Sequence, residues 1–163
     1  MIEGWHVVAH VGADPVPDDW HAQLVQRLGY RPRRVGSWTE LAMHGALRCI
    51  DAAGEATLPA GARLRVGSRR GPWAATCAGL EQLDAGLTMP FTFMQSQPAL
   101  ALAEVGRCLG WRGDGSFVLN RDAAQLLRLV VHGAGPDGLL LGQVEEAGGA
   151  LPMRSEWWRL LPA

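Results

Sequence analysis

The chain has 163 residues, of which 48% are hydrophobic and 19% charged, which favours one folded domain and argues against intrinsic disorder. The formal net charge of −1 gives no electrostatic reason to bind nucleic acid. All fifteen basic residues are arginines, which excludes lysine-dependent chemistry such as Schiff bases. We therefore expect a single domain over residues 1–163.

The cysteines and the apolar segments bear on the cellular compartment. Cys49, Cys77 and Cys108 are odd in number, widely spaced and set in helical patterns, as expected for buried thiols in a reducing cytosol. Met1–Gly4 has neither the basic nor the apolar run of a secretion signal. No stretch approaches the roughly 18 apolar residues that span a bilayer. The sequence thus predicts a soluble cytoplasmic protein without a membrane segment, metal or cofactor.

The first third of the chain predicts one strand and two helices. Trp5–Val11 is a short apolar run suited to a buried strand. Apolar residues at helical spacing predict a helix from Asp18 to Leu28 and a second that is capped by Ser37 or Thr39 and ends at Gly54. Ala62–Gly67 alternates apolar and arginine residues, which predicts a half-exposed strand.

The middle of the chain predicts two further helices around an irregular segment. Pro72 suits the first position of a helix that ends near Gly86. Pro90–Gln97 is predicted to be irregular or extended. A helix rich in small residues is predicted from Pro98 to Gly110.

The last part predicts strand, turn, helix and strand. Ser116–Leu119 is a strand, and Asp122–His132 carries a regular helical apolar stripe. Gly138–Val144 is continuously apolar, as in a strand covered on both faces, and Glu145-Glu146 is interpreted as its solvated end. The alternation of strands and helices predicts a layered α/β domain with a mostly parallel sheet.

The tail, residues 151–163, is rich in tryptophan and leucine. It contains Trp157 and Trp158 together with two prolines. Two interpretations remain open: the tail packs on its own domain, or it docks on a partner, for which Trp is a favoured anchor.

Several candidate sites are weak. Gly67–Gly71 carries two arginines before a helix but lacks a phosphate-binding glycine pattern, so a sharp turn is the preferred interpretation. His6 and His10 have an even spacing that would place them on one face of a strand, without the ligands of a metal site. None of Ser68, Ser96 and Ser116 has the flanking pattern of a nucleophile elbow.

The turn after the strand Ser116–Leu119 lacks a nucleophile. The tight turn after Ser116–Leu119 is where such folds often place a nucleophile, and it reads Asn120-Arg121-Asp122. No Cys or Ser follows the strand directly. The turn therefore has the setting of an active site without a nucleophile.

The order of these elements resembles the β-ketoacyl synthases. Val66–Pro72 resembles their Gly-Ser…Gly-Pro strand-to-helix turn, and Pro90–Phe93, followed by a small-residue helix and Leu109–Gly113, resembles their PF…GLRG stretch. Phe117–Leu119 and Gly138–Glu145 resemble the nucleophile strand and the later Gly-Gly…Glu strand. The resemblance covers residues 60–147 well and residues 1–59 only in outline, and it implies the N-terminal half of a thiolase-type fold.

The departures from that family concern catalysis. The catalytic Cys of the family falls at about Asn120–Asp122, so this turn is interpreted as vestigial, and the second half that carries the family's histidines has no counterpart here. The resemblance then implies a partner subunit without independent activity, like a chain-length factor in aryl-polyene or polyketide synthesis. Its partner would be a full-length ketosynthase, or a second copy of this chain.

The resemblance also implies particular interface residues. Thr92, Phe93, Met94 and Gln95 would close the end of the partner's acyl tunnel. The helix Pro98–Gly110 and strand Ser116–Leu119 would lie in the dimer interface, although the small residues of the helix, Ala99, Ala101, Ala103 and Gly106, equally suit a contact within the chain.

Two alternatives remain open. The first is a small α/β enzyme of another class, using Asp122, His132 or an arginine. The second is an acyl-binding or carrier-protein-binding module, in which Arg69, Arg70 and Arg112 would meet the acidic surface of an acyl carrier protein.

Overall fold

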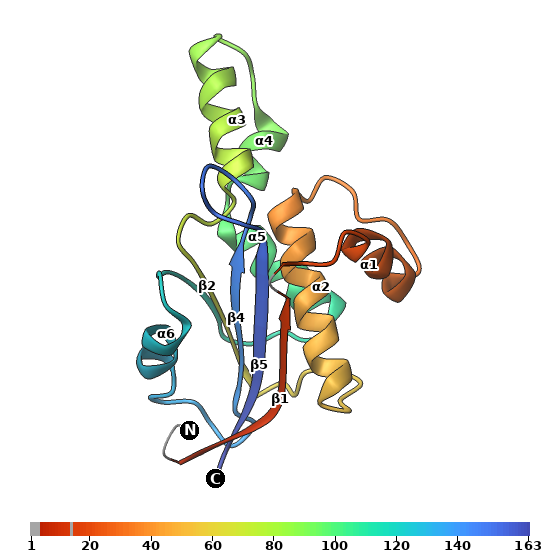
Figure 1. The fold of residues 1–163 in the computed structure, drawn as a ribbon, viewed down its shortest axis with the longest axis vertical. Helices are drawn as coiled ribbons and strands as arrows, with labels where there is room; N and C mark the ends of the chain where they lie inside the picture. Colours follow the sequence, from red (N-terminus) through yellow and green to blue (C-terminus); the bar gives the residue numbers. More distant parts are fainter. Residues whose placement is uncertain (1–3, 14) are drawn as a thin grey trace.

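The computed structural model describes residues 4–13 and 15–163, which form one five-stranded sheet flanked by helices (Figure 1). The structure does not describe Met1–Glu3. These residues make up most of the segment that was predicted not to be a secretion signal. The strands are β1 (Trp5–Ala13), β2 (Arg63–Ser68), β3 (Gly115–Leu119), β4 (Leu139–Glu145) and β5 (Arg154–Pro162). The helices are α1 (Trp20–Leu28), α2 (Ser37–Ala52), α3 (Trp73–Asp84), α4 (Pro90–Gln95), α5 (Pro98–Cys108) and α6 (Ala123–Val130).

The sheet is mixed, with strand order β1-β5-β4-β2-β3. β2 pairs in parallel with both β3 and β4, whereas β5 pairs antiparallel with both β4 and β1. The layered α/β prediction is confirmed, but a mostly parallel sheet is not what forms. The difference arises because the tail, residues 151–163, contains a strand that inserts between β4 and β1.

The fold of the tail depends on one tryptophan. Trp157 is fully buried and packs against Gly45 of α2 and Gly142 of β4. A Cβ atom added at Gly142 would lie only 2.6 Å from the indole ring. Its indole Nε1 donates a hydrogen bond to Ser155 Oγ at 3.1 Å. The two glycines therefore leave the space that the indole occupies.

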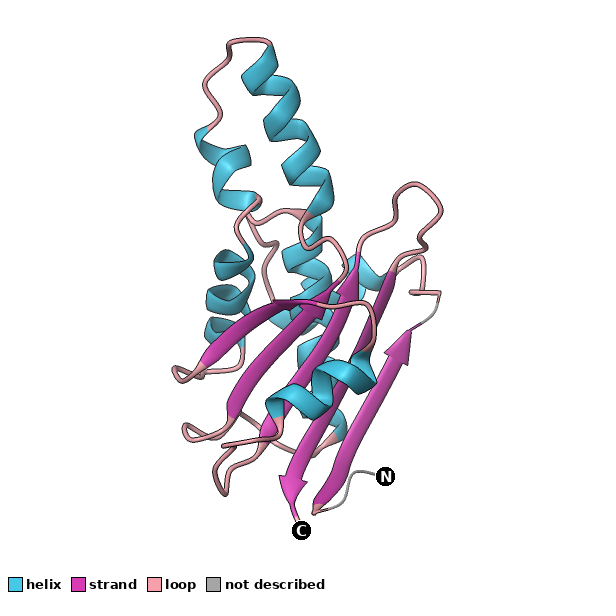
Figure 2. Cartoon of the chain, turned by 90° about the vertical axis from the view of Figure 1, so that its left-hand side faces the viewer, coloured by secondary structure: helices cyan, strands magenta, loops and turns pink. Residues whose placement is uncertain are grey.

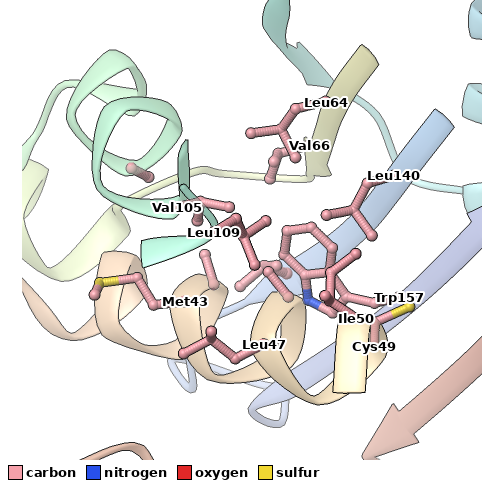
Figure 3. Close-up of a cluster of buried hydrophobic side chains, with 14 of the residues drawn as sticks. Met43, Leu47, Cys49, Ile50, Leu64, Val66, Val105, Leu109, Leu140 and Trp157 are labelled. Atoms are coloured by element: carbon pink, nitrogen blue, oxygen red, sulfur yellow. The ribbon is translucent and has the colours of Figure 1, made fainter. Parts of the chain in front are cut away.

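Two hydrophobic clusters lie on opposite faces of the sheet. The larger joins α1, α2 and α5 to residues such as Leu64, Leu140 and Trp157 (Figure 3). The smaller joins Leu126 of α6 to Leu141 and other strand residues, and α6 lies in front of the sheet in Figure 2. β4 is buried along its whole length between the two, which confirms its prediction as a doubly covered strand.

Two local predictions were wrong. Pro90–Gln97 was predicted as irregular, yet Pro90–Gln95 forms α4, a single short helix that starts at a proline and gives too little periodicity to detect. His6 and His10 do not share a face, because a β-bulge shifts the register between Val7 and Ala9. His10 stacks instead on Trp158, with ring centroids 5.1 Å apart.

β2 is buried rather than half-exposed. Arg65, which gave the strand its alternating pattern, is only 8% exposed. Its guanidinium donates to Asp114 Oδ2 at 2.6 Å and to the Asp114 carbonyl oxygen at 2.7 Å. The hydrogen bond from Arg65 also holds the pKa of Asp114 below its ordinary value.

We predict that Asp114→Asn destabilises the fold by about 1–2 kcal/mol at pH 7, a range that allows for solvent screening of the half-exposed carboxylate. Because the folded-state pKa of Asp114 is lowered, its contribution is present above the unfolded pKa near 4 and is lost as pH falls through the folded value. Urea unfolding at pH 7 and pH 3 measures this. The control is Asp51→Asn, whose Arg27 partner is half-exposed, unlike the buried Arg65, and whose expected cost is below about 1 kcal/mol. Equal costs for the two variants at pH 7 would contradict the prediction.

Candidate functional site

The carboxyl ends of β2, β3 and β4 meet at one edge of the sheet because the three strands are parallel. Ser68 ends β2, Asn120 follows β3 and Glu145 ends β4. The backbone N–H of Asn120 donates to the Ser68 carbonyl at 2.8 Å, which joins the first two strand ends. The turn predicted to be a vestigial nucleophile position therefore lies where such folds place their sites.

The turn Asn120-Arg121-Asp122 is held by local hydrogen bonds. Asn120 Oδ1 accepts from the Asp122 N–H at 2.7 Å, and the Asp122 carboxylate caps α6 by accepting from the Ala124 N–H at 2.9 Å. Both side-chain oxygens thus act in shaping the turn and starting the helix. Neither Asn nor Asp supplies the activated hydroxyl or thiol that acyl transfer needs.

The Ser68 hydroxyl lies at the strand end that is bonded to Asn120, and all of its hydrogen bonds are made within the chain. Its Oγ donates to Glu145 Oε2 at 3.0 Å and accepts from the Gly71 N–H at 2.8 Å and the Arg70 N–H at 3.3 Å. The residue is completely buried. Ser68 therefore stabilises the tight turn between β2 and α3, where Gly71 has a φ of +64°.

Glu145 and Glu146 were predicted to form a solvated strand end, and this was wrong: both are 5% exposed. Glu145 Oε1 accepts from the Arg69 N–H at 2.5 Å and from Gln143 Nε2 at 3.1 Å. These bonds, with that from Ser68, tie the ends of β2 and β4 together.

Glu146 serves a different set of donors. Its Oε2 accepts from the Ala74 N–H at 3.0 Å in the first turn of α3, and its Oε1 accepts from Ser37 Oγ at the start of α2. A carboxylate is favourable at the N-terminus of a helix, and the Glu146 carboxylate lies at the N-termini of both α2 and α3. Sequence reasoning missed Glu146 because its partner Ser37 is 109 residues away. The available signal was an acidic pair directly at the end of an entirely buried strand.

The three arginines predicted as a carrier-binding set do not form one patch. Arg70 Nη2 donates to the carbonyl of Gly148 at 3.1 Å, and its guanidinium lies over the Trp73 ring, 5.2 Å from the ring centroid. Arg69 follows the end of β2, whereas Arg112 precedes the start of β3 at the opposite end of the parallel pair. Five paired residues separate these ends, which corresponds to roughly 15 Å.

The groups considered for another enzyme class are also apart. Asp122 and His132 lie beyond opposite ends of the eight-residue helix α6. Cys108 donates to the Val105 carbonyl within α5, and burial raises the pKa of its thiol to about 12, so it is not a reactive thiolate. Residues 4–13 and 15–163 contain no cluster of three metal-ligating side chains.

The four predicted tunnel residues divide between two faces of α4. Thr92 and Gln95 are half-buried and line a cavity of about 230 Å³ against α3, with Glu146 in its wall. Phe93 and Met94 are exposed on the opposite side. The second pair is therefore the more accessible to another chain.

Phe93 and Met94 belong to a larger apolar surface. α3 and α4 form a helical hairpin that projects beyond the sheet (Figure 1). Large apolar side chains at least 41% exposed lie along it, and we call them the hairpin surface: Trp73, Leu80, Leu83, Leu87, Phe91, Phe93 and Met94. Large exposed apolar side chains gathered on one projecting element, as on this hairpin, are typical of interaction sites.

The small residues of α5 face both ways. Ala101 and Gly106 are buried inside the chain, and Gly106 packs against Trp111. Ala99 and Ala103 are exposed. Ala103 also lines an open groove of about 660 Å³ that runs between α5 and the start of β3. β3 itself is an edge strand, paired on one side only.

Among the described residues, no helix combines the length and the apolar character needed to cross a bilayer.

Neither a protein-family model nor a curated protein matches this sequence. Solved structures match in fold. A chain in the complex of a ketosynthase with its chain length factor from Xenorhabdus doucetiae superposes with a TM-score of 0.68 at 14% identity, over 99% of this chain and 80% of that chain. A β-ketoacyl synthase from Burkholderia phymatum STM815 superposes with a TM-score of 0.59 at 15% identity, over 90% of this chain and 45% of that chain. The chain thus spans less than half of the latter protein, and its fold is ketosynthase-like, as the sequence motifs predicted.

Proposed function

We propose that this chain is a non-catalytic, ketosynthase-like subunit that pairs with a full-length ketosynthase, in the manner of a chain-length factor. The observation that carries the proposal is the hairpin surface, which leaves seven large apolar side chains exposed on a ketosynthase-like fold. The free edge of β3 lies on the same molecule and offers unpaired backbone groups to a partner. The turn Asn120-Arg121-Asp122, without a thiol or free hydroxyl, supports a role that does not include acyl transfer.

The proposed effect on product length is steric. Phe93 and Met94 would form a wall at the end of the partner's acyl tunnel, with Phe91 beside them. Each added methylene gains only about 0.8 kcal/mol from burial, so a bulky wall limits chain length more sharply than attraction does. An aryl-polyene or related polyketide is the product class we propose.

An acyl carrier protein is a weaker candidate partner. Arg69 and Arg112 lie at opposite ends of the parallel strands, and Arg70 is engaged by backbone carbonyls. An independent enzyme is also a weaker candidate, because the Asp122 carboxylate already caps α6.

The proposal predicts that this chain, co-expressed with a full-length ketosynthase from the same organism, elutes with it as one complex of equal stoichiometry. Size-exclusion chromatography with light scattering measures this, and the chain alone serves as the control that reports self-association. The ketosynthase is expected to form long-chain product only as the complex. Separate elution of the two proteins at micromolar concentration, with the ketosynthase fully active alone, would refute the pairing.

A further inference from the structure

The loops that follow β2 and β3 diverge at the carboxyl edge of the sheet. β2 leads into α3 and then α5, and α5 packs on the same face as α2, whereas β3 leads into α6 on the opposite face. In open α/β sheets, ligands bind where the loops of adjacent parallel strands diverge in this way. Here that point is occupied by Arg69 after β2 and Arg121 after β3.

A small hollow of about 170 Å³ lies at this point. Three arginines from three different strand ends line it, Arg69, Arg121 and Arg154, together with Gln143 and Glu145. At about 30 Å³ for each water molecule, the hollow holds roughly six waters, which is the size of a small anion rather than of a nucleotide or an acyl chain.

The charges around the hollow are unbalanced. Arg154 pairs with Glu156, but no carboxylate among the described residues lies within ion-pair distance of Arg69 or Arg121. The Glu145 carboxylate already accepts hydrogen bonds from Ser68, Gln143 and the Arg69 backbone. The side chains of Arg69 and Arg121 thus remain as two uncommitted guanidinium groups at the rim of one hollow.

We propose that this hollow binds a small oxyanion, the carboxylate or phosphate group of a small molecule, with Arg69 and Arg121 as its direct ligands. A guanidinium presents its N–H donors in a planar fork that matches both kinds of oxyanion. The site uses side chains at the carboxyl ends of the parallel strands and none of the hairpin surface, so the chain alone is expected to bind the anion.

Isothermal titration calorimetry of the full chain tests the site with two probes, inorganic phosphate and malonate, at ionic strength matched with chloride. We expect saturable binding of at least one probe, and the stronger one identifies the kind of oxyanion. Arg69→Gln and Arg121→Gln are each expected to weaken that binding at least tenfold.

The control is Arg128→Gln, an exposed arginine of α6 outside the hollow, which is expected to bind as the unaltered chain does. The side chains of Arg69 and Arg121 make no hydrogen bond to any other described residue, so the unfolding midpoints of both variants should be unchanged. The proposal is overturned if neither probe binds beyond the chloride control, or if Arg121→Gln binds as tightly as Arg128→Gln.

Discussion

Truncation of Trp157 to alanine is expected to destabilise the fold by about 3–5 kcal/mol, the range for a large aromatic side chain removed from a core. Trp157 is completely buried, and its ring fills the space left by Gly45 and Gly142. The cavity cannot collapse easily, because two strands and α2 surround it. Removal of the indole also leaves the Ser155 hydroxyl without the bond from Nε1.

The neighbouring tryptophan is the matched control. Trp158 points to the other face of β5, is only partly buried and stacks on the exposed His10. Trp158→Ala is therefore expected to cost about 1 kcal/mol. Urea unfolding followed by far-ultraviolet circular dichroism measures both, and Trp157→Phe provides an intermediate if the alanine variant does not fold. Equal losses for the two positions would show that β5 is not anchored through Trp157.

The elements that sequence patterns predicted well are those stabilised locally. α2 carries its apolar residues at helical spacing, and β4 is an unbroken apolar run, so both were predicted with nearly correct bounds. The ketosynthase-like fold followed from the order of such elements and the glycine-containing turns between them.

The features that were missed depend on partners distant in sequence. β5 contains a completely buried arginine, Arg159, which is tolerated because Glu55 accepts two hydrogen bonds from it at 2.7 and 2.9 Å. Glu146 is buried because Ser37 and the first turn of α3 surround its carboxylate. Sequence patterns predict a charged residue to be exposed unless its partner is known. The partners of Arg159 and Glu146 are both distant in the sequence.

The same limit applies to the candidate site. The turn Asn120–Asp122 could be located from the strand and helix around it, because both patterns are local. The hollow beside it could not, because it joins Arg69, Arg121 and Arg154 from three strand ends. The sequence also did not show that Thr92 and Gln95 lie on a different face from Phe93 and Met94, because α4 was not predicted as a helix.

Aspartate at Leu83 or Phe93 is expected to weaken association with the ketosynthase at least 100-fold, about 3 kcal/mol at 25 °C. An ionised carboxylate placed inside an apolar interface loses its hydration without gaining a partner, and the apolar contact is lost as well. Both side chains are exposed in the free chain, at 65% for Leu83 and 57% for Phe93, so the folding of the isolated chain should hardly change. Co-elution and the free energy of unfolding together separate loss of binding from loss of fold.

Leu129→Asp is the control that separates loss of the hairpin contact from the general effect of a new surface carboxylate. Leu129 is 62% exposed, so the substitution has the same chemistry and nearly the same starting exposure, but it lies on α6 and not on the hairpin surface. Retention of the complex by Leu129→Asp and its loss in Leu83→Asp would assign the interface to the α3–α4 hairpin. If Leu129→Asp dissociates the complex while Leu83→Asp does not, the partner covers the α6 face of the sheet instead, and Phe93 and Met94 cannot limit the length of its product.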